Sequence, residues 1–362
     1  MDGTRRLASP SRRKPPARYT IPMRAADLLV PRPEGLYCPK GGFHIDPTRP
    51  VARALVTHAH SDHATRGHGA VLATRETLDI MAIRLGDDFA ARVEETACGT
   101  PHRIGDVTAT FHPAGHVLGS AQIAVEAQGF RIVASGDYKR TPDPTCAPFE
   151  PVPCDVFITE ATFALPVFRH PPPQAEIARL LASLAQFPDR THLVGVYALG
   201  KAQRLLRLLR DAGHEAPVYL HGALRRLCDY YVARGIDLGP LAEATVDRPG
   251  SRGAAKDFAG TIVLGPPSAF EGPWIRRFAD PLIAFASGWM QVRARARQRG
   301  VELPLVLSDH CDSTELTDTI AELAPAEVWV THGREEALVR WCALQGLPAR
   351  PLHLVGYEDE TE

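Results

Sequence analysis

The sequence lacks several features that would assign it to a common class of protein. Its seven cysteines are an odd number, lie scattered along the chain and include no CxxC pair. This pattern argues against a disulfide framework and a cysteine-based zinc site, and it favours a reducing, cytoplasmic setting. No apolar run approaches the roughly 18 residues that a membrane span needs, so we expect no role for a membrane.

The first residues are basic and rich in proline, and no apolar segment follows them. They read RRLASPSRRKPPAR at positions 5–18. Without an apolar segment they do not form a secretory signal. We therefore expect residues 1–19 to be a disordered basic tail, with an electrostatic arm for nucleic acid as the alternative.

The overall net charge of −1 hides an uneven distribution. Residues 165–300 contain 19 Lys and Arg against 11 Asp and Glu, a net charge of +8, which leaves −9 for the rest of the chain. A basic region beside an acidic one favours a polyanionic substrate that docks next to a carboxylate-rich site.

The length of 362 residues predicts two modules, or one large domain with an insertion. Residues 20–165 read as short strands split by turns, with a hairpin around Gln128-Gly129. A proline-rich stretch, FRHPPPQ at 168–174, marks a boundary. After it, strands alternate with helices, which predicts a parallel α/β sheet. Two last strand–loop–helix units carry a histidine just past the strand, where α/β folds place their chemistry.

The densest cluster of chemically useful side chains is THAHSDHA at residues 57–64. His58 and His60 are two residues apart, so they point the same way while the chain is extended. Asp62 and His63 follow as the chain turns. Such a loop offers two imidazoles to one metal ion, and a carboxylate and a third imidazole to a second. These ligand types suit Zn, Mn or Fe.

Three further ligand candidates stand at predicted strand ends. They are His116 in PAGHVLGSA, Asp137 in ASGDYK and His332 in VTHG. Each alone would more often be structural, but together they complete two sites whose ions, about 3.5–4 Å apart, can clamp a phosphodiester. We predict two divalent ions, Zn or Mn, with this division of ligands: His58, His60 and His116 for one ion, Asp62, His63 and His332 for the other, and Asp137 as the bridge.

The set FHIDP, THAHSDHA, AGHVLGS, SGD and VTHG resembles the motifs of the metallo-β-lactamase superfamily. The resemblance implies an α/β fold, a four-layer αββα sandwich, with the binuclear site at one edge of its two sheets. Asp46, in FHIDP, matches the first motif. Its implied role is to hold the histidine loop by hydrogen bonds rather than to bind metal.

Later motifs resemble the β-CASP nuclease branch. Glu160 in ITEATF matches its acidic motif A, His310 in SDHCD its motif B, and His332 its motif C. The stretches YALGKAQRL, SGWMQVR and LSDHCD resemble most the bacterial ligase-associated DNA exonucleases. The inserted module is smaller than in RNA-cleaving relatives.

This resemblance implies a domain arrangement. A metallo-β-lactamase domain would comprise residues 20–167 and 301–362, and a small β-CASP-like domain would be inserted at residues 168–300.

Roles for individual residues follow from the resemblance and from their chemistry. We expect Asp62, His310 and Glu160 to be catalytic. His310 would protonate the leaving oxygen, and Glu160 would orient its imidazole. Lys201 and Arg204 lie about one turn apart at the start of a predicted helix, so they share a face. They would contact a substrate phosphate, although a solvated basic face is the alternative.

The function predicted is a binuclear metal-dependent exonuclease that hydrolyses DNA, single-stranded or at ends, during repair. The resemblance implies association with an ATP-dependent DNA ligase and a helicase. RNA is the rival substrate. A lactonase or thioesterase and a non-catalytic scaffold are the remaining alternatives. The run RARARQRG at 293–300 fits either a phosphate track or a solvated loop.

Overall fold

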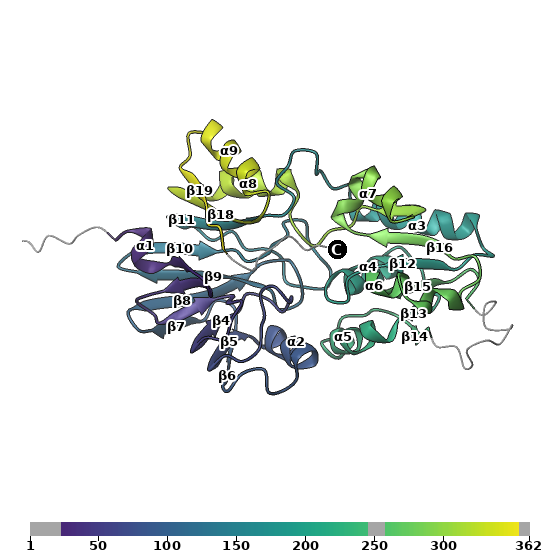
Figure 1. Cartoon of the computed structure of the whole chain (residues 1–362), viewed down its shortest axis with the longest axis horizontal. Coiled ribbons are helices and arrows are strands. Elements are labelled where there is room, and N and C mark those ends of the chain that lie inside the picture. The colour runs from purple at the N-terminus through teal and green to yellow at the C-terminus, as the bar shows by residue number, and fades with distance from the viewer. Residues whose placement is uncertain (1–22, 245–257, 355–362) are drawn as a thin grey trace, which may run out of the picture.

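The computed structural model describes residues 23–244 and 258–354. Two sheets lie on one side of the molecule and a third sheet lies on the other (Figure 1). The predicted basic tail at 1–19 falls outside the described residues. Within the described ranges, every helix is too short or too polar to cross a bilayer.

The first sheet has six strands that follow the chain order from β1 to β6. Strands β1 to β3 pair antiparallel, and β3 to β6 pair parallel. The histidine loop THAHSDHA comes shortly after β4. The strands are β1 (Val30–Arg32), β2 (Gly35–Cys38), β3 (Phe43–Ile45), β4 (Arg53–Leu55), β5 (Ala70–Thr74) and β6 (Val93–Thr96).

The second sheet has seven strands in the order β19-β18-β11-β10-β9-β8-β7. The predicted hairpin around Gln128-Gly129 is confirmed, because both residues have positive φ angles (53° and 79°) and join antiparallel β9 and β10. The strands are β7 (Pro101–Ile104), β8 (Val107–Pro113), β9 (Ala121–Ala127), β10 (Phe130–Ala134), β11 (Val156–Ala161), β18 (Glu327–Gly333) and β19 (Ala349–Pro351).

These two sheets pack face to face with helices on their outer faces. Leu55 and Leu72 of the first sheet share a buried cluster with Ile123 of the second. Alternate residues of the first sheet, such as Ala54 and Val71, face the opposite way, as a strand's period of two requires. The predicted αββα sandwich of a metallo-β-lactamase-like fold is therefore confirmed. Its helices are α1 (Ala25–Leu28), α2 (Arg75–Leu85), α8 (Ser313–Leu323) and α9 (Glu335–Leu344).

The third sheet has six strands, all parallel, in the order β14-β13-β15-β12-β16-β17. This confirms the parallel α/β sheet predicted from the alternation of strands and helices. The strands are β12 (His192–Gly195), β13 (Val218–Leu220), β14 (Leu241–Glu243), β15 (Ile262–Gly265), β16 (Leu282–Ala286) and β17 (Leu303–Leu305).

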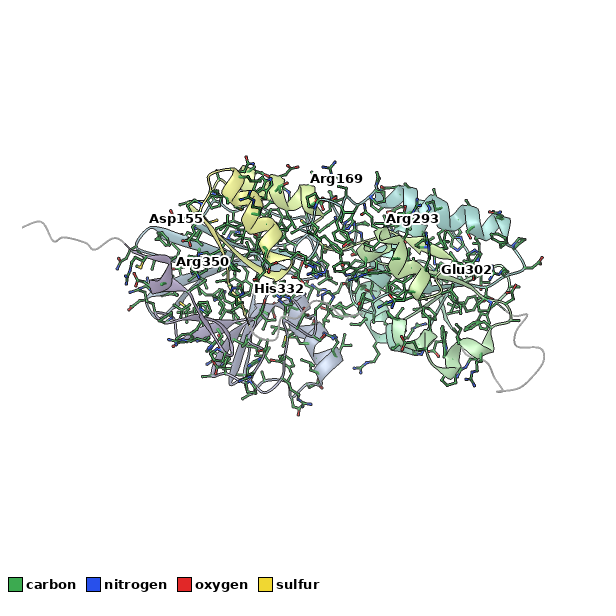
Figure 2. All side chains as sticks on the ribbon, turned by 45° about the horizontal axis from the view of Figure 1, so that its top comes forward. Asp155, Arg169, Arg293, Glu302, His332 and Arg350 are labelled. Carbon is green, nitrogen blue, oxygen red and sulfur yellow. The ribbon has the colours of Figure 1, made fainter. Side chains whose placement is uncertain are left out.

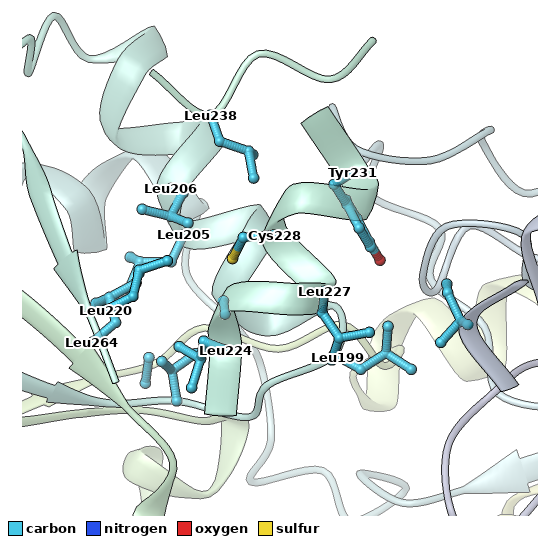
Figure 3. Close-up of a cluster of buried hydrophobic side chains, with 14 of the residues drawn as sticks. Leu199, Leu205, Leu206, Leu220, Leu224, Leu227, Cys228, Tyr231, Leu238 and Leu264 are labelled. Atoms are coloured by element: carbon cyan, nitrogen blue, oxygen red, sulfur yellow. The ribbon is translucent and has the colours of Figure 1, made fainter. Parts of the chain in front are cut away.

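Helices α4 and α5 cover one face of the third sheet. Leu205 and Leu206 of α4 meet Leu224 and Cys228 of α5 in one buried cluster (Figure 3). The same cluster includes side chains of α2, so apolar packing joins the two sides of the molecule. The helices of this part are α3 (Pro173–Gln186), α4 (Lys201–Asp211), α5 (Gly222–Ala233), α6 (Pro267–Phe270), η2 (Pro273–Arg277), η3 (Gly288–Gln291) and α7 (Arg293–Gln298).

The sheet pairing bears on where the inserted module ends. The sequence predicts its last residue at 300, but β17, at Leu303–Leu305, pairs with β16 of the third sheet. We therefore propose that the inserted module extends through Leu305. The proline-rich stretch lies directly before α3, where the predicted module begins.

Candidate metal centre

Asp46 anchors the histidine loop. It follows β3 with a φ of 44°, a left-handed conformation that a short polar residue tolerates. Its Oδ1 accepts a hydrogen bond from the Thr57 backbone N–H at 2.7 Å, and its Oδ2 accepts one from Thr57 Oγ1 at 2.6 Å. His63 Nδ1 lies 2.8 Å from the same Oδ2. Since a carboxylate only accepts, His63 Nδ1 donates, which leaves its Nε2 for a metal.

The first ligand group combines His58, His60, His116 and Asp137. One ligand atom from each lies within 4.8 Å of the others. His60 Nδ1 is 3.2 Å from His58 Nε2 and 3.0 Å from His116 Nε2. A tetrahedral zinc ion with Zn–N bonds of about 2.0–2.1 Å separates its ligand nitrogens by about 3.3 Å. The three imidazoles therefore fit one divalent ion.

The second ligand group combines Asp62, His63 and His332, again within 4.8 Å of one another. His63 Nε2 is 3.6 Å from Asp62 Oδ2, and the rings of His63 and His332 stack with centroids 4.9 Å apart. His332 ends β18 with a φ of 58° and lies in the central part of the molecule (Figure 2). The structure thus brings together the same three residues that the sequence grouped.

Asp137 lies between the two groups. Its Oδ2 is 3.4 Å from His58 Nε2, 3.4 Å from His63 Nε2 and 3.8 Å from His116 Nε2. One carboxylate oxygen therefore faces ligands of both groups, as a bridging ligand must. The preceding Gly136 permits this approach, because it has a φ of 57° and a Cβ there would lie 2.7 Å from Thr57 Oγ1.

Burial and charge set the protonation of the imidazoles. Burial lowers the pKa of His58 well below its usual value, and it lowers those of His116 and His332 to about 4. They are therefore neutral at pH 7, which is the form that binds metal. Burial also acts to lower the pKa of His63, but the Asp137 and Asp62 carboxylates outweigh it and raise that pKa well above the usual value. The two carboxylates therefore create a negative potential at His63 that favours a bound cation.

A buried acid pair lies beside the ligands. His310 Nδ1 is 3.0 Å from Glu160 Oε2, and Glu160 Oε1 accepts a hydrogen bond from the Tyr138 backbone N–H at 2.9 Å. His310 Nε2 has no hydrogen-bond partner among the described residues. Burial acts to lower the pKa of His310, but the charges of Glu160 and Asp137 raise it to about 10. His310 is therefore protonated at neutral pH, with one N–H available for a ligand.

Sequence reasoning assigned no role to Asp309, which the structure places in the same cluster. Its backbone carbonyl is 2.9 Å from His116 Nδ1, so this nitrogen donates and Nε2 is left for metal. Its carboxylate Oδ1 is 3.4 Å from Lys201 Nζ. The signal was present in SDHCD, where an acidic residue directly precedes His310.

Lys201 and Arg204 are not the solvated basic face that was the alternative prediction. They begin α4 and are only 3% and 1% exposed. Lys201 pairs with Asp309, and Arg204 Nη1 is 3.5 Å from Asp143 Oδ2. Gly200, with a φ of 83°, lets the chain pass so close that a Cβ there would lie 3.2 Å from Asp309 Oδ2.

The loop before α4 also touches the metal ligands directly. The Leu199 carbonyl oxygen is 3.3 Å from His60 Nε2. Because a carbonyl only accepts, His60 presents its Nδ1 to the first ligand group. The third sheet's side of the molecule therefore completes the site from across the boundary between the two parts.

Comparisons with known proteins were made for the whole chain. No family model matches it. The chain is 30% identical over 331 residues to a probable DNA ligase of Opitutus terrae, covering 87% of this chain and 30% of that protein. It is 31% identical over 201 residues to the endoribonuclease ysh1 of Aspergillus fumigatus, covering 52% and 22%. It is 31% identical over 212 residues to the ribonuclease TTHA0252 of Thermus thermophilus, covering 49% and 48%.

The chain thus spans less than a third of the ligase and about half of the Thermus ribonuclease. Among solved structures, a protein of unknown function from Enterococcus faecalis V583 is similar with a TM-score of 0.55 and 13% identity, over 79% of this chain and 76% of that one. At that identity the likeness concerns the fold alone. The named relatives support the resemblance to metallo-β-lactamase and β-CASP nucleases without separating their subgroups.

Proposed function

We propose that this protein is a metal-dependent nuclease that hydrolyses phosphodiester bonds. The observation that carries the proposal is the position of Asp137 Oδ2, which faces two imidazole-rich ligand groups at once. The buried Glu160–His310 pair lies next to it, with one ligand atom of each residue within 4.8 Å of one from Asp137. Two cation sites and a proton donor together are what in-line displacement at phosphorus requires.

The residues present fit two divalent ions, Zn or Mn. When bound, such ions lower the pKa of water and neutralise charge on the phosphoryl oxygens. His58, His60 and His116 would hold one ion, and Asp62, His63 and His332 the other, with Asp137 shared. Asp46 orients His63, and the Asp309 carbonyl orients His116.

His310 is proposed to deliver the proton that the leaving oxygen needs. Its Nδ1 is held by Glu160, so its Nε2–H is the proton that can move. Glu160 keeps this imidazole charged, since its carboxylate raises the pKa of His310. A positioned acid of this kind contributes about 10²–10⁴ in rate.

Lys201 and Arg204 are proposed to face substrate phosphates. Arg204 lines a cavity of about 490 Å³ together with Ser308, and the Ser308 hydroxyl accepts a hydrogen bond from the His310 backbone N–H. Lys201, paired with Asp309, would add positive potential on the side of His60.

DNA is the substrate that we propose first, with exonuclease action in repair beside an ATP-dependent ligase and a helicase. The alignment with part of a protein named probable DNA ligase supports DNA. The relatives named endoribonuclease support RNA as the second candidate. The Glu160–His310 pair disfavours a thioesterase, because a thiolate leaving group needs no proton donor. A lactone releases an alkoxide, so lactonase action stays an alternative that the cleavage assay tests.

A cleavage assay tests the proposal. End-labelled single-stranded DNA, duplex DNA and RNA of one sequence are incubated with Mn or Zn and with wild type, Asp62→Ala or His310→Ala. Asp106→Ala, which removes an exposed carboxylate, is the matched control. We expect metal-dependent cleavage that both site variants lose and the control keeps. The product ladder gives polarity and separates exonuclease from endonuclease action.

Two outcomes would redirect the assignment. Cleavage of RNA alone would keep the chemistry and reject the repair role. An enzyme loaded with metal that cuts none of the three nucleic acids, but opens a lactone or thioester, would reject the nuclease proposal.

A further inference from the structure

The run RARARQR at 293–299 forms a basic face that the metal centre does not use. Arg293, Arg295 and Arg297 lie on α7 and are exposed, and residues 293–299 contain no acidic side chain. Arg169, which lies in the proline-rich stretch, is exposed as well. Figure 2 shows Arg169 and Arg293 on the same upper side of the molecule.

None of these four arginines has an ion-pair partner among the residues that the structure describes, and the Arg295 guanidinium lies over the Trp289 ring. Arg169, Arg293 and Arg297 are absent from every ion pair found there, whereas exposed arginines elsewhere are commonly paired, as Arg66 is with Asp88. An unpaired guanidinium keeps its full charge for a ligand. Three together form a surface suited to an extended polyanion.

Packing fixes this face close to the acid pair. The Phe163 ring lies 6.2 Å from the His310 ring and 4.8 Å from the Trp289 ring, and the Arg295 guanidinium lies 4.0 Å over Trp289. The Arg295 guanidinium is therefore no more than about 15 Å from His310. That distance corresponds to a few nucleotides of extended strand.

One cavity brings Arg169 together with residues next to the acid pair. Its volume is about 490 Å³, and its lining includes Ser308, Arg204 and Arg169. The segment before Arg169 is tied to η3, because Gln291 Nε2 donates a hydrogen bond to the Val167 carbonyl. Arg169 thus shares a cavity with Ser308 and belongs to a segment that is hydrogen-bonded to η3.

We infer that Arg169, Arg293 and Arg297 form a binding surface for the phosphate backbone of a nucleic-acid strand, on one side of the bond that is cut. This inference rests on the proposed function. Trp289, the ring beneath Arg295, is only 6% exposed and offers no face on which a base could stack, so the contacts proposed here are to phosphates. Binding there is therefore independent of sequence and strongly dependent on salt.

The test compares long and short substrates. The variant Arg169→Gln/Arg293→Gln/Arg297→Gln is assayed with Mn on a 12-nucleotide DNA, the matching RNA and a dinucleotide. The control Arg226→Gln/Arg276→Gln/Arg277→Gln removes the same charge from exposed positions on α5 and η2. A third variant places Lys at 169, 293 and 297.

We expect KM for the 12-mer to rise about 10- to 100-fold at 0.1 M salt with kcat unchanged. The slope of log KM against log salt should fall by about 2, since each phosphate contact on a single strand contributes about 0.7. The dinucleotide should be cleaved as by wild type, the control should not change, and the Lys variant should recover most of the loss. The comparison of the DNA with the matching RNA shows which nucleic acid the surface binds.

An unchanged KM for the 12-mer would overturn the inference, and so would an equal loss in the control or on the dinucleotide. Failure of the proposed function looks different, because wild type would then cleave none of the three substrates. Equilibrium binding of the 12-mer separates the two cases. Binding that depends on these arginines, without cleavage, would keep the surface and reject the nuclease.

Discussion

The proposed metal ligands and the acid pair are assembled in different ways, although they lie in one cluster. The metal ligands come mainly from loops of the two packed sheets, and His58, His60 and Asp62 lie within five residues of one another. The acid group is assembled from distant segments, because Glu160 ends β11 and His310 follows β17 of the third sheet. Part of the site is therefore local, and part depends on how the two sides of the molecule pack.

This difference predicts which substitutions remove metal and which remove only proton transfer. Substitution of a proposed ligand should remove at least one metal ion per chain. Substitution in the acid pair should leave the metal content unchanged.

The largest effect is expected for Asp137→Asn. The amide keeps the shape but removes the charge that faces both ligand groups. We expect kcat to fall by about 10³ or more, because a bound metal supplies several kcal/mol and each 1.36 kcal/mol is tenfold. Metal analysis should show loss of at least one ion per chain, while Asp106→Asn keeps both. Two ions per chain with activity within tenfold of wild type would contradict the bridging role.

His310→Ala separates the two parts of the site. We expect a loss of about 10²–10⁴ in kcat on a natural phosphodiester, with metal content unchanged. A 4-nitrophenyl phosphodiester should lose far less, because its leaving group needs no proton. His112→Ala, which changes a histidine that pairs with Glu150 and is outside the proposed ligand set, is the control. An equal loss on both substrates would show that His310 acts through the metals instead.

The same contrast explains what the sequence predicted. The spacing HxHxDH names four candidate ligands at once, since residues after one strand must share a loop, and the structure places them together. Asp137 and His332 were found because each stands at a strand end in a short motif. The hairpin at Gln128-Gly129 and the parallel third sheet were readable from turn chemistry and alternation.

Long-range contacts were not readable. Asp309 contacts His116 across 193 residues, and its partner Lys201 begins α4. No local pattern shows that a lysine expected at a phosphate is buried against a carboxylate. The pairing of β17 with β16 was not readable either, because the pairing of an edge strand depends on its neighbour rather than on its own three residues.

Asp46→Asn tests whether the hydrogen bonds of Asp46 hold the histidine loop in place. Asn tolerates the φ of 44°, so the backbone should be kept. The amide can keep only part of the hydrogen bonding to Thr57 and His63, so His63 is held less firmly. Partners of this kind are worth about 10–100-fold in metal affinity.

Titration with Zn should show this lower affinity, and activity should return at high metal concentration. A variant that binds Zn as tightly as wild type would show that the histidine loop keeps its conformation without the Asp46 carboxylate.

Glu160→Gln should have the smallest effect on kcat at neutral pH, and it should shift the pH dependence of kcat in one defined direction. The general acid works while protonated, so the rate falls as pH rises through the pKa of His310. Burial acts to lower that pKa, and the Glu160 charge is the largest influence that raises it. Removing the charge must therefore move the alkaline fall of kcat to lower pH, with kcat reduced by less than about tenfold near neutrality.

Profiles of kcat between about pH 6 and 10 on a natural phosphodiester measure this shift. The 4-nitrophenyl substrate should show no shift, because its pH dependence reports only the metal centre. A limb that stays in place on both substrates would mean that Glu160 holds the fold of β11 rather than the charge of His310.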